Sequence, residues 1–425
     1  MTERGASSLR LELVTIGDEL LLGFTVDTNA AFLARALSEI GVEVVSRTTV
    51  GDAPEEIVRG VRAALDRTGA VVTTGGLGPT ADDRTRPALA AMFGRALHRD
   101  ADLMARMEQR FADLGATMPP SNITQAMRPE GARILDNSQG TAPGLWIEDE
   151  RGRWVAMLPG VPREMRTMTT DVLVPLLRDR VGNDAAVVLS RTLRTTGIGE
   201  SALAERLAED GHDAVDGLPL AFLPGWEGVD LRLTAKGMPR AAARVALDGA
   251  VVKLRSHVAR YVYGQDGADL AALVLDLSRA RRMHIATAES CTGGVLGARL
   301  TAIPGSSDVF TGGVIAYDDR VKTKMLGVPA GMLFEHGAVS ESVALAMASG
   351  VRATLGTDIG IGVTGIAGPG GGTPDKPVGT VWIAVDVGGV TRSLGRRYLG
   401  DRDEIRQRSA QAALDAVRRE LIHAD

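Results

Sequence analysis

The chain has 425 residues, which is enough for two or three domains at roughly 100–200 residues each. Hydrophobic residues make up 44% and charged residues 24%, which argues against disorder, and the formal net charge of -5 gives no basic footprint for nucleic acid. No apolar run suits a membrane span or the core of a signal peptide, and the single cysteine excludes an internal disulfide, so we expect a cytoplasmic protein without a membrane partner.

The first third of the chain alternates predicted strands and helices. Residues 9–17 form a β-rich apolar run that ends in glycine, and residues 27–40 place apolar side chains at helical spacing behind a capping Asp27. Such an order predicts a parallel sheet covered by helices. The further elements expected here are a strand at 42–50, a helix at 54–67, a strand at 70–76, a hairpin at 144–160 and a helix at 162–170.

Residues 175–262 have a different pattern, which predicts a small α+β domain. A strand, a glycine turn near Gly197 and a helix precede two strands around a Pro-Gly turn and a helix at 239–257. The GxxG-like turn beside basic residues is typical of an RNA-binding KH module. We favour the alternative, a spacer domain with a solvated basic face, and expect no nucleic-acid partner. The basic residues are Arg232, Lys236, Arg240, Arg244, Lys253 and Arg255.

The α/β alternation resumes at residue 266. The chain as a whole therefore predicts two three-layer α/β domains with largely parallel sheets, joined by a small α+β, KH-like middle domain. We place these domains at residues 1–174, 175–262 and 263–425. The last domain is expected to contain helices at 269–282, from Thr292, from near Asp318, at 341–355 and at 402–422, and strands at 283–290, 309–317, 359–365, 377–387 and 390–399.

Two nucleophilic side chains, Ser290 and Cys291, fall where a predicted strand ends and a helix begins, with Gly293 and Gly294 in the first turn. Ligand sites of parallel α/β sheets gather at the carboxyl ends of strands, and the free N–H groups of a helix N-terminus stabilise an oxyanion or a phosphate. Either side chain is therefore a candidate nucleophile. Simple capping of the helix by the same segment explains the pattern equally well.

A base for this nucleophile has to come from a histidine or a lysine. His336 is the one reasonable histidine for a Ser-His-Asp triad, and a capping or core role suits it as well. A desolvated lysine can lose its charge and act as a base, and Lys322 falls one turn into the helix predicted from Asp318. A solvated helix lysine is the alternative interpretation.

The segment 363–380 follows a buried strand and contains five glycines before residue 373, which leave the backbone free to wrap a ligand and to present N–H groups to an anion. It contains neither a P-loop lysine nor a GxGxxG helix start, which excludes those two phosphate motifs. Arg402, just before the final predicted helix, is suited to pair with a phosphate, although an isolated arginine is more often a surface residue.

Five segments of this region together resemble the C-terminal domain of the CinA (competence/damage-inducible protein A) family. They are AESCTGG, TGGVIAYDDRVKTKMLGV, HGAVSE, GVTGIAGPGGGTPDKPVGTVW and GDRDEIR, in the family's order within residues 266–422. That domain is similar to nicotinamide mononucleotide (NMN) deamidase, which hydrolyses NMN to nicotinic acid mononucleotide and ammonia, and for which we expect no cofactor. The resemblance implies the nucleophile Ser290, its base Lys322, the further catalytic residues Tyr317 and Thr364, and the substrate-binding residues Thr292, Gly293, Gly365, Gly368 and Arg402.

The implied chemistry agrees with the residues. Ser290 attacks the carboxamide, backbone N–H groups hold the oxyanion, and Lys322 takes the hydroxyl proton and returns one to the departing ammonia. Cys291 is intrinsically the better nucleophile. Consecutive side chains point apart, so Ser290 and Cys291 cannot both address one carbonyl group.

Acidic residues follow two strands of the N-terminal region at the same predicted edge of the sheet. Asp18 and Glu19 come just after the first strand, and Asp82 and Asp83 come just after the third strand and its glycine-rich turn. Carboxylates beside such a turn suit a divalent cation that bridges phosphate oxygens. Helix caps and ordinary turns are the alternative.

The segments GDELLLG, TGGLGPTADD, NSQGTAPG and LPGVPREM resemble the molybdopterin-binding MoaB/MogA-like domain over residues 9–172. In CinA proteins this domain is associated with a metal-dependent ADP-ribose pyrophosphatase, which implies ADP-ribose as substrate and Mg, Mn or Co as the metal ion. The matched nucleotide-binding residues are Asp27, Asn29, Gly75, Gly76, Gly78, Thr80, Pro159 and Gly160. The implied metal ligands are Asp18, Glu19, Asp82, Asp83 and Glu164.

Two functions of different classes remain open at this point. The first is a bifunctional pyridine-nucleotide salvage enzyme, and the second is a pterin- or nucleotide-binding scaffold protein linked to competence or DNA damage. Fold analogy alone does not decide between pterin binding and pyrophosphate hydrolysis. The resemblance also implies a homodimer.

Overall fold

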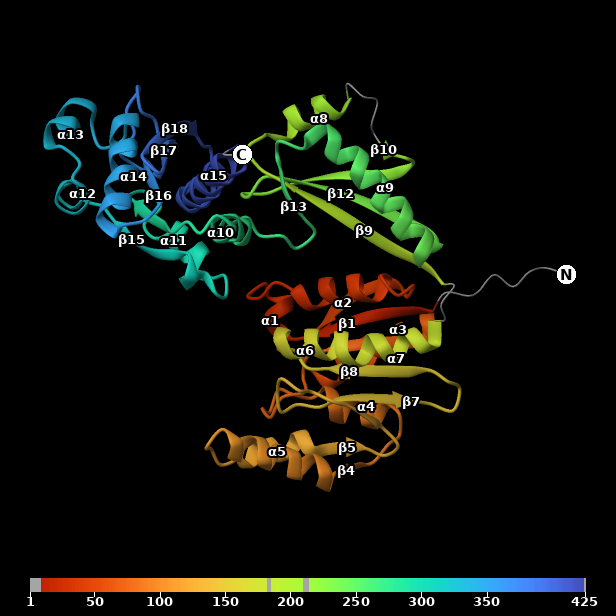
Figure 1. Ribbon diagram of the computed structural model, residues 1–425. Coiled ribbons are helices and arrows are strands. Elements are labelled where there is room, and N and C mark those ends of the chain that lie inside the picture. The colour runs from red at the N-terminus through yellow and green to blue at the C-terminus, as the bar shows by residue number, and fades with distance from the viewer. Residues whose placement is uncertain (1–8, 182–184, 209–213, 424–425) are drawn as a thin grey trace. The chain divides into compact units, whose positions relative to one another are not determined.

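The computed structural model describes residues 9–181, 185–208 and 214–423 (Figure 1). Within these ranges no helix is long and apolar enough to cross a membrane. The chain divides into an N-terminal unit, residues 1–189 with 235–246, and a C-terminal unit, residues 190–234 with 247–425.

The N-terminal unit is built on a six-stranded sheet of order β2-β1-β3-β8-β7-β6 and a separate two-stranded ribbon. The strands are β1 (Arg10–Ile16), β2 (Glu43–Val50), β3 (Ala70–Thr74), β6 (Arg133–Leu135), β7 (Gly144–Glu148) and β8 (Trp154–Leu158), with β4 (Leu97–Arg99) and β5 (Met127–Pro129) in the ribbon. Strands β2, β1, β3 and β8 pair in parallel, as expected. Strands β7 and β6 add an antiparallel edge, and β7 with β8 forms the expected hairpin.

Helices cover both faces of this sheet (Figure 1). They are α1 (Asp18–Leu21), α2 (Thr28–Ser38), α3 (Pro54–Thr68), α4 (Thr85–Met92), α5 (Ala101–Asp113), α6 (Pro162–Met168) and α7 (Val174–Val181). Alternate side chains of β1 point to opposite faces, so Leu11 and Leu13 pack with α2, α6 and α7, while Val14 and Ile16 pack with α3 and α4. Burying each such side chain stabilises the fold by roughly 1.5–3 kcal/mol.

Local sequence signals account for most of the helix boundaries. The Asp27 carboxylate accepts a hydrogen bond from the Ala30 amide and starts α2, and Pro54 occupies the first turn of α3. The helix expected at 162–170 is longer than predicted, because a five-residue π-helical turn, Thr169–Leu173, joins α6 to α7. This turn keeps Leu173 and Leu177 buried in the same core as Met165 and Met168.

The C-terminal unit contains most of one further sheet, whose residues 186–189 and 235–239 belong to the N-terminal unit, and all of another. The first, of order β10-β11-β12-β9-β13, is antiparallel in the strand pairs recorded for it and carries α8 (Glu200–Ala208) and α9 (Arg240–Val258). The expected helix at 239–257 is therefore confirmed as α9. Its strands are β9 (Ala186–Thr195), β10 (Ala214–Val215), β11 (Leu218–Pro224), β12 (Val229–Pro239) and β13 (Val262–Gln265). The small α+β fold expected for this region is confirmed.

The second sheet has the order β15-β14-β16-β17-β18, with β15, β14 and β16 parallel and β17 and β18 antiparallel. The strands are β14 (Ile285–Glu289), β15 (Phe310–Ile315), β16 (Ile359–Gly365), β17 (Thr380–Val387) and β18 (Val390–Arg397). The helices are α10 (Leu270–Ala280), α11 (Val295–Thr301), α12 (Asp319–Leu326), α13 (Ala330–His336), α14 (Glu341–Leu355) and α15 (Arg402–His423). Alternation along β14 again separates two layers: Ile285 packs with α10, α11 and α15, and Ala286 and Ala288 pack with α12 and α14.

One helix start differs from the prediction. The helix expected from Thr292 begins at Val295, because Gly293 and Gly294 both adopt left-handed backbone angles, with φ of 58° and 96°. Two left-handed residues form a turn that an α-helix does not contain. The strand that ends just before Ser290 is therefore followed by a glycine turn and then by the helix.

Candidate active sites

A cavity of about 200 Å³ lies at the carboxyl ends of β14 and β16 in the C-terminal unit. It is the place where a parallel α/β sheet is expected to bind its ligand. Its lining residues are Ser290, Cys291, Tyr317, Asp319, Lys322, Ala338, Val339, Thr364, Gly365, Ala367 and Arg402.

Ser290 and Cys291 both reach this cavity, but their surroundings differ. The Ser290 amide donates to the Val363 carbonyl oxygen at 2.9 Å, which extends the β14–β16 pairing by one residue. Cys291 is buried in the hydrophobic core, and this burial raises the pKa of its thiol to about 12. A thiol with that pKa remains protonated at neutral pH and is a poor nucleophile. The environment therefore favours Ser290 over Cys291.

Lys322 is one of the largest fully buried side chains of the described chain, with 1% of its surface exposed. It lies on α12, which Asp318 caps by accepting from the Arg320 amide. The Lys322 Nζ donates to Asp319 Oδ1 at 2.9 Å and to the Tyr317 carbonyl oxygen at 3.4 Å. The interpretation of Lys322 as a solvated helix lysine is therefore wrong.

Arg402, the first residue of α15, joins two walls of the cavity. Its Nη1 donates to the Gly368 carbonyl oxygen at 2.6 Å, and its Nη2 donates to the Tyr317 hydroxyl at 2.8 Å. An arginine has five N–H donors, so further N–H groups remain for an anion. Because arginine only donates, the Tyr317 hydroxyl is the acceptor in this contact and keeps its own proton for another acceptor.

The helix that follows Ser290 does not offer its first amides to a ligand, which corrects the expectation for this segment. The buried Glu289 carboxylate accepts from the amides of Gly294, Leu296 and Gly297 at 2.8–3.1 Å. A carboxylate at this position satisfies the N–H groups and interacts favourably with the helix dipole. The Gly294 amide at the start of α11 and the Leu296 and Gly297 amides within the helix are therefore not available as oxyanion donors.

The structure brings together six of the predicted C-terminal site residues and leaves out three. Ser290, Tyr317, Lys322, Thr364, Gly365 and Arg402 line the cavity, and Thr364 Oγ1 donates to the Ala338 carbonyl oxygen at 2.7 Å. Thr292, Gly293 and Gly368 are not among the lining residues. Gly368 and Thr292 act through their carbonyl oxygens, which accept from Arg402 and from Arg406. The structure adds Asp319, whose spacing of three residues from Lys322 is a recognisable signal for a helical ion pair.

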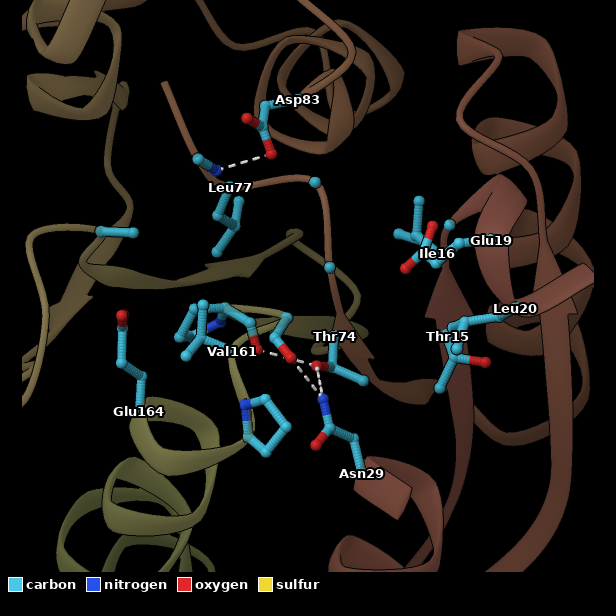
Figure 2. Close-up of a pocket in the computed structure, with 18 of the residues that line it drawn as sticks. Thr15, Ile16, Glu19, Leu20, Asn29, Thr74, Leu77, Asp83, Val161 and Glu164 are labelled. Carbon is cyan, nitrogen blue, oxygen red and sulfur yellow. Dashed lines mark hydrogen bonds between the residues drawn. The ribbon is translucent and has the colours of Figure 1, made fainter. Parts of the chain in front are cut away.

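A second cavity, of about 560 Å³, lies in the N-terminal unit at the carboxyl ends of β1, β3 and β8 (Figure 2). Asn29 and Thr74 form its floor: Asn29 Nδ2 donates to Thr74 Oγ1 and to the Gly160 carbonyl oxygen, and Thr74 Oγ1 donates to the Pro159 carbonyl oxygen. The predicted residues that line it are Glu19, Asp27, Asn29, Gly75, Gly76, Gly78, Asp82, Asp83, Pro159, Gly160 and Glu164.

Two predicted N-terminal residues lie outside this lining, namely Asp18 and Thr80. The Gly75 backbone passes so close to β1 that a Cβ atom would lie 2.2 Å from the Ile16 carbonyl oxygen, and Gly75 has a left-handed φ of 110°. Glycine is therefore required where the loop after β3 turns into the cavity.

The five predicted metal ligands do not form one centre. The Asp83 carboxylate accepts from the amides of Gly78 and Thr80, and the Glu164 carboxylate accepts from Asn137 Nδ2 (Figure 2 shows the Asp83 contact). Asp18 Oδ1 accepts from the Asp52 amide. In the described ranges no group of three or more His, Cys, Asp or Glu side chains is placed to hold a metal ion. A metal ion bound by protein ligands alone does not fit these residues.

Comparison with known families finds one match for each of the three large sheets. Residues 12–179 match the probable molybdopterin binding domain, residues 190–264 match the damage-inducible protein CinA KH domain, and residues 267–421 match the CinA C-terminal domain. The chain is thus a multidomain α/β protein with a molybdopterin-binding-type domain, a KH domain and a CinA C-terminal domain.

Full-length relatives identify the family. The chain is 61% identical over 410 residues to a CinA-like protein of Gemmatimonas aurantiaca, with 96% of both chains covered, and 44% identical to a CinA-like protein of Salinibacter ruber, with 97% of this chain and 100% of the relative covered. A crystal structure of the competence damage-inducible protein A from Klebsiella pneumoniae covers 37% of this chain and 97% of its own, at 38% identity and a TM-score of 0.36. The chain belongs to the CinA family.

Proposed function

We propose that the C-terminal unit hydrolyses the carboxamide of NMN to nicotinic acid mononucleotide and ammonia. The observation that carries this proposal is the shared cavity of Ser290 and Lys322, in which the lysine is 1% exposed. A hydroxyl nucleophile and a buried lysine that line one cavity are the groups that a Ser-Lys hydrolase requires. The family resemblance supplies the substrate, and Arg402 supplies donors for its phosphate.

The proposed reaction proceeds in two steps. Ser290 Oγ attacks the carboxamide carbon, and the neutral form of Lys322 takes the hydroxyl proton at Nζ. The same proton passes to the departing nitrogen, which leaves as ammonia, and an acyl-enzyme remains. Water then attacks the ester and releases the carboxylic acid and the serine. Because the first amides of α11 are bonded to Glu289, we assign the Tyr317 O–H, which is free to donate, to the oxyanion.

Ammonia release from NMN by the purified full-length protein tests this function. We expect stoichiometric formation of ammonia and nicotinic acid mononucleotide without added metal. Absence of turnover in a folded sample would favour the alternative, a binding protein without C-terminal catalysis.

We propose a second activity for the N-terminal cavity, namely binding and cleavage of ADP-ribose. The supporting observation is a 560 Å³ cavity lined by a glycine turn and by the carboxylates of Glu19 and Asp82. A divalent ion is commonly held by one or two carboxylates together with substrate phosphates, and it would neutralise the pyrophosphate charge. The test is release of AMP from ADP-ribose with and without Mg²⁺, Mn²⁺ or Co²⁺. Pterin binding without cleavage is the result that would replace this proposal.

A further inference from the structure

A further cavity, of about 460 Å³, lies in the C-terminal unit and shares no lining residue with the cavity of Ser290. Its walls are the turn 196–200, the loop 224–229, part of β18 at 394–398 and the middle of α15 at 408–415. Its volume falls within the range of roughly 300–1,000 Å³ that is typical of small-molecule sites. None of the residues assigned to the two proposed activities lines it.

Gln411 lines this cavity and has an unpaired side-chain amide nitrogen. Its side chain is buried, with 2% exposed, and its Oε1 accepts from Arg299 Nη1 at 2.6 Å. Arginine only donates hydrogen bonds, so the atom that contacts Arg299 must be the side-chain oxygen of Gln411. The side-chain nitrogen, Nε2, therefore points away from Arg299. Nε2 has no hydrogen-bond partner among the described residues. A buried amide that is left unpaired costs free energy, so an acceptor in the cavity would be stabilising.

The charges around the cavity favour an anion. Three carboxylates line the cavity. Asp415 pairs with Arg418 and Arg419, and Glu227 pairs with Arg194 and Arg299, so the charges of these two are neutralised. The third, Glu200, is exposed to solvent, which screens its charge. Within the part of the chain that the structure describes, the Nε of Arg408 is buried and has no hydrogen-bond partner. Arg396 and Arg397 line the cavity as well. The planar guanidinium group of arginine matches the geometry of a phosphate.

The loop side of the cavity presents an aromatic surface. Trp226 lines it and is 40% exposed, and the Arg299 guanidinium lies 5.2 Å from the ring centroid. Arg299 also holds Gln411, so the indole and the unpaired amide are fixed by one side chain. An indole that is held on one side and open on the other is suited to stack with a planar ring.

We propose that this cavity binds a nucleoside monophosphate, with the phosphate at Arg408, the ring against Trp226 and a polar edge at the Gln411 amide. The proposal does not depend on the activity of either proposed active site. It requires a compact ligand, since the four wall segments enclose a volume that suits one nucleotide rather than a strand.

The test is titration of the full-length protein with AMP, followed by equilibrium dialysis and by tryptophan fluorescence. We expect saturable binding that Arg408→Gln weakens about tenfold or more, the loss typical of a charge-assisted hydrogen bond. Trp226→Phe should remove the fluorescence change. Arg392→Gln is the control, because Arg392 lies on β18 with the lining residues Arg396 and Arg397 but pairs with Glu420 and lies outside the cavity. This variant should bind AMP like the wild type.

Other outcomes separate this proposal from its competitors. Unchanged AMP binding in Arg408→Gln, or binding that is lost in Ser290→Ala or Asp82→Ala instead, would place the ligand in another cavity and overturn the proposal. If inorganic phosphate binds as tightly as AMP, the proposed contact between the nucleotide ring and Trp226 is excluded. If an RNA oligonucleotide binds more tightly than AMP, the cavity is part of a nucleic-acid surface. If Arg408→Gln fails to fold, Arg397→Gln at the rim should still weaken AMP binding several-fold.

Discussion

Ser290 and Cys291 are consecutive residues, but their surroundings favour only Ser290 as the nucleophile. Both side chains line the cavity that contains Lys322, but burial raises the pKa of the Cys291 thiol to about 12 and so keeps it protonated at neutral pH. The residue types alone favoured cysteine, because a thiol is intrinsically the stronger nucleophile. Only the surroundings of each side chain reverse that order.

Substitution of these two residues should therefore have unequal effects. We expect Ser290→Ala to lower kcat for NMN deamidation by roughly 10⁴-fold or more, as loss of a catalytic nucleophile does. Cys291→Ala should keep most of the activity. Steady-state ammonia release by both variants is the measurement, and the reverse order would exclude the Ser-Lys mechanism.

Lys322 allows a second comparison on a single helix. We expect Lys322→Gln to lower kcat by roughly 10²–10⁴-fold, because the proton transfer that it performs is worth that much. Lys324→Gln is the matched control, since Lys324 is exposed on the same helix and does not line the cavity. Equal activity of the two variants would show that Lys322 is a structural residue.

At the scale of elements, the backbone between Ser290 and α11 requires glycine at position 294. A Cβ atom on Gly294 would lie 3.2 Å from Ile315 Cδ1, and its φ of 96° is unfavourable for any other residue. We expect Gly294→Ala to lower the free energy of unfolding by about 1–3 kcal/mol, measured by urea denaturation. Gly249→Ala, at an exposed position of α9 with open space around it, should raise the free energy of unfolding by roughly 0.4–1 kcal/mol. A loss of stability at Gly249 instead would contradict the conformational argument.

The cap of α12 gives a pH-dependent prediction. A side-chain hydrogen bond from Arg320 lowers the pKa of Asp318 from 3.8 to about 2. Because the folded pKa is the lower one, the stabilisation is complete well above pH 3.8 and is lost as the pH falls through about 2. We expect the stability difference between wild type and Asp318→Asn to be constant near neutral pH and to shrink below pH 3.8 in acid-titrated thermal unfolding. A pH-independent difference would mean that the cap acts without its charge.

Helix and strand types followed from local patterns, because caps, prolines and apolar periodicity act over a few residues. Asp27, Pro54 and Asp318 each start a helix at the predicted place. The start of α11 was predicted three residues too early, because the left-handed φ angles of Gly293 and Gly294 delay the helix to Val295. The length of α6 with α7 was also missed, because the shared core and not the local pattern continues that helix.

At the scale of the whole molecule, the two proposed activities should be separable. We expect Asp82→Ala to abolish ADP-ribose cleavage and to leave NMN deamidation intact, and Ser290→Ala to do the opposite, because the two residues belong to different compact units. Both assays on each variant are the measurement, and unchanged ADP-ribose cleavage by Asp82→Ala would refute its role. The homodimer stays a prediction, which sedimentation equilibrium of the full chain checks.

The sequence by itself determined the family, the order of the elements and most of the residues that line the two predicted cavities, since the motifs lie at strand ends that a parallel sheet must bring to one edge. Only the tertiary structure decided how those residues are used. In the folded protein, Glu289 accepts hydrogen bonds from amides at the start of α11, and Asp83 and Glu164 are engaged in hydrogen bonds of their own. The fold also forms a third cavity between two segments about 200 residues apart, 196–228 and 394–415. These outcomes depend on which polar groups find partners across the fold, and no local pattern records that competition.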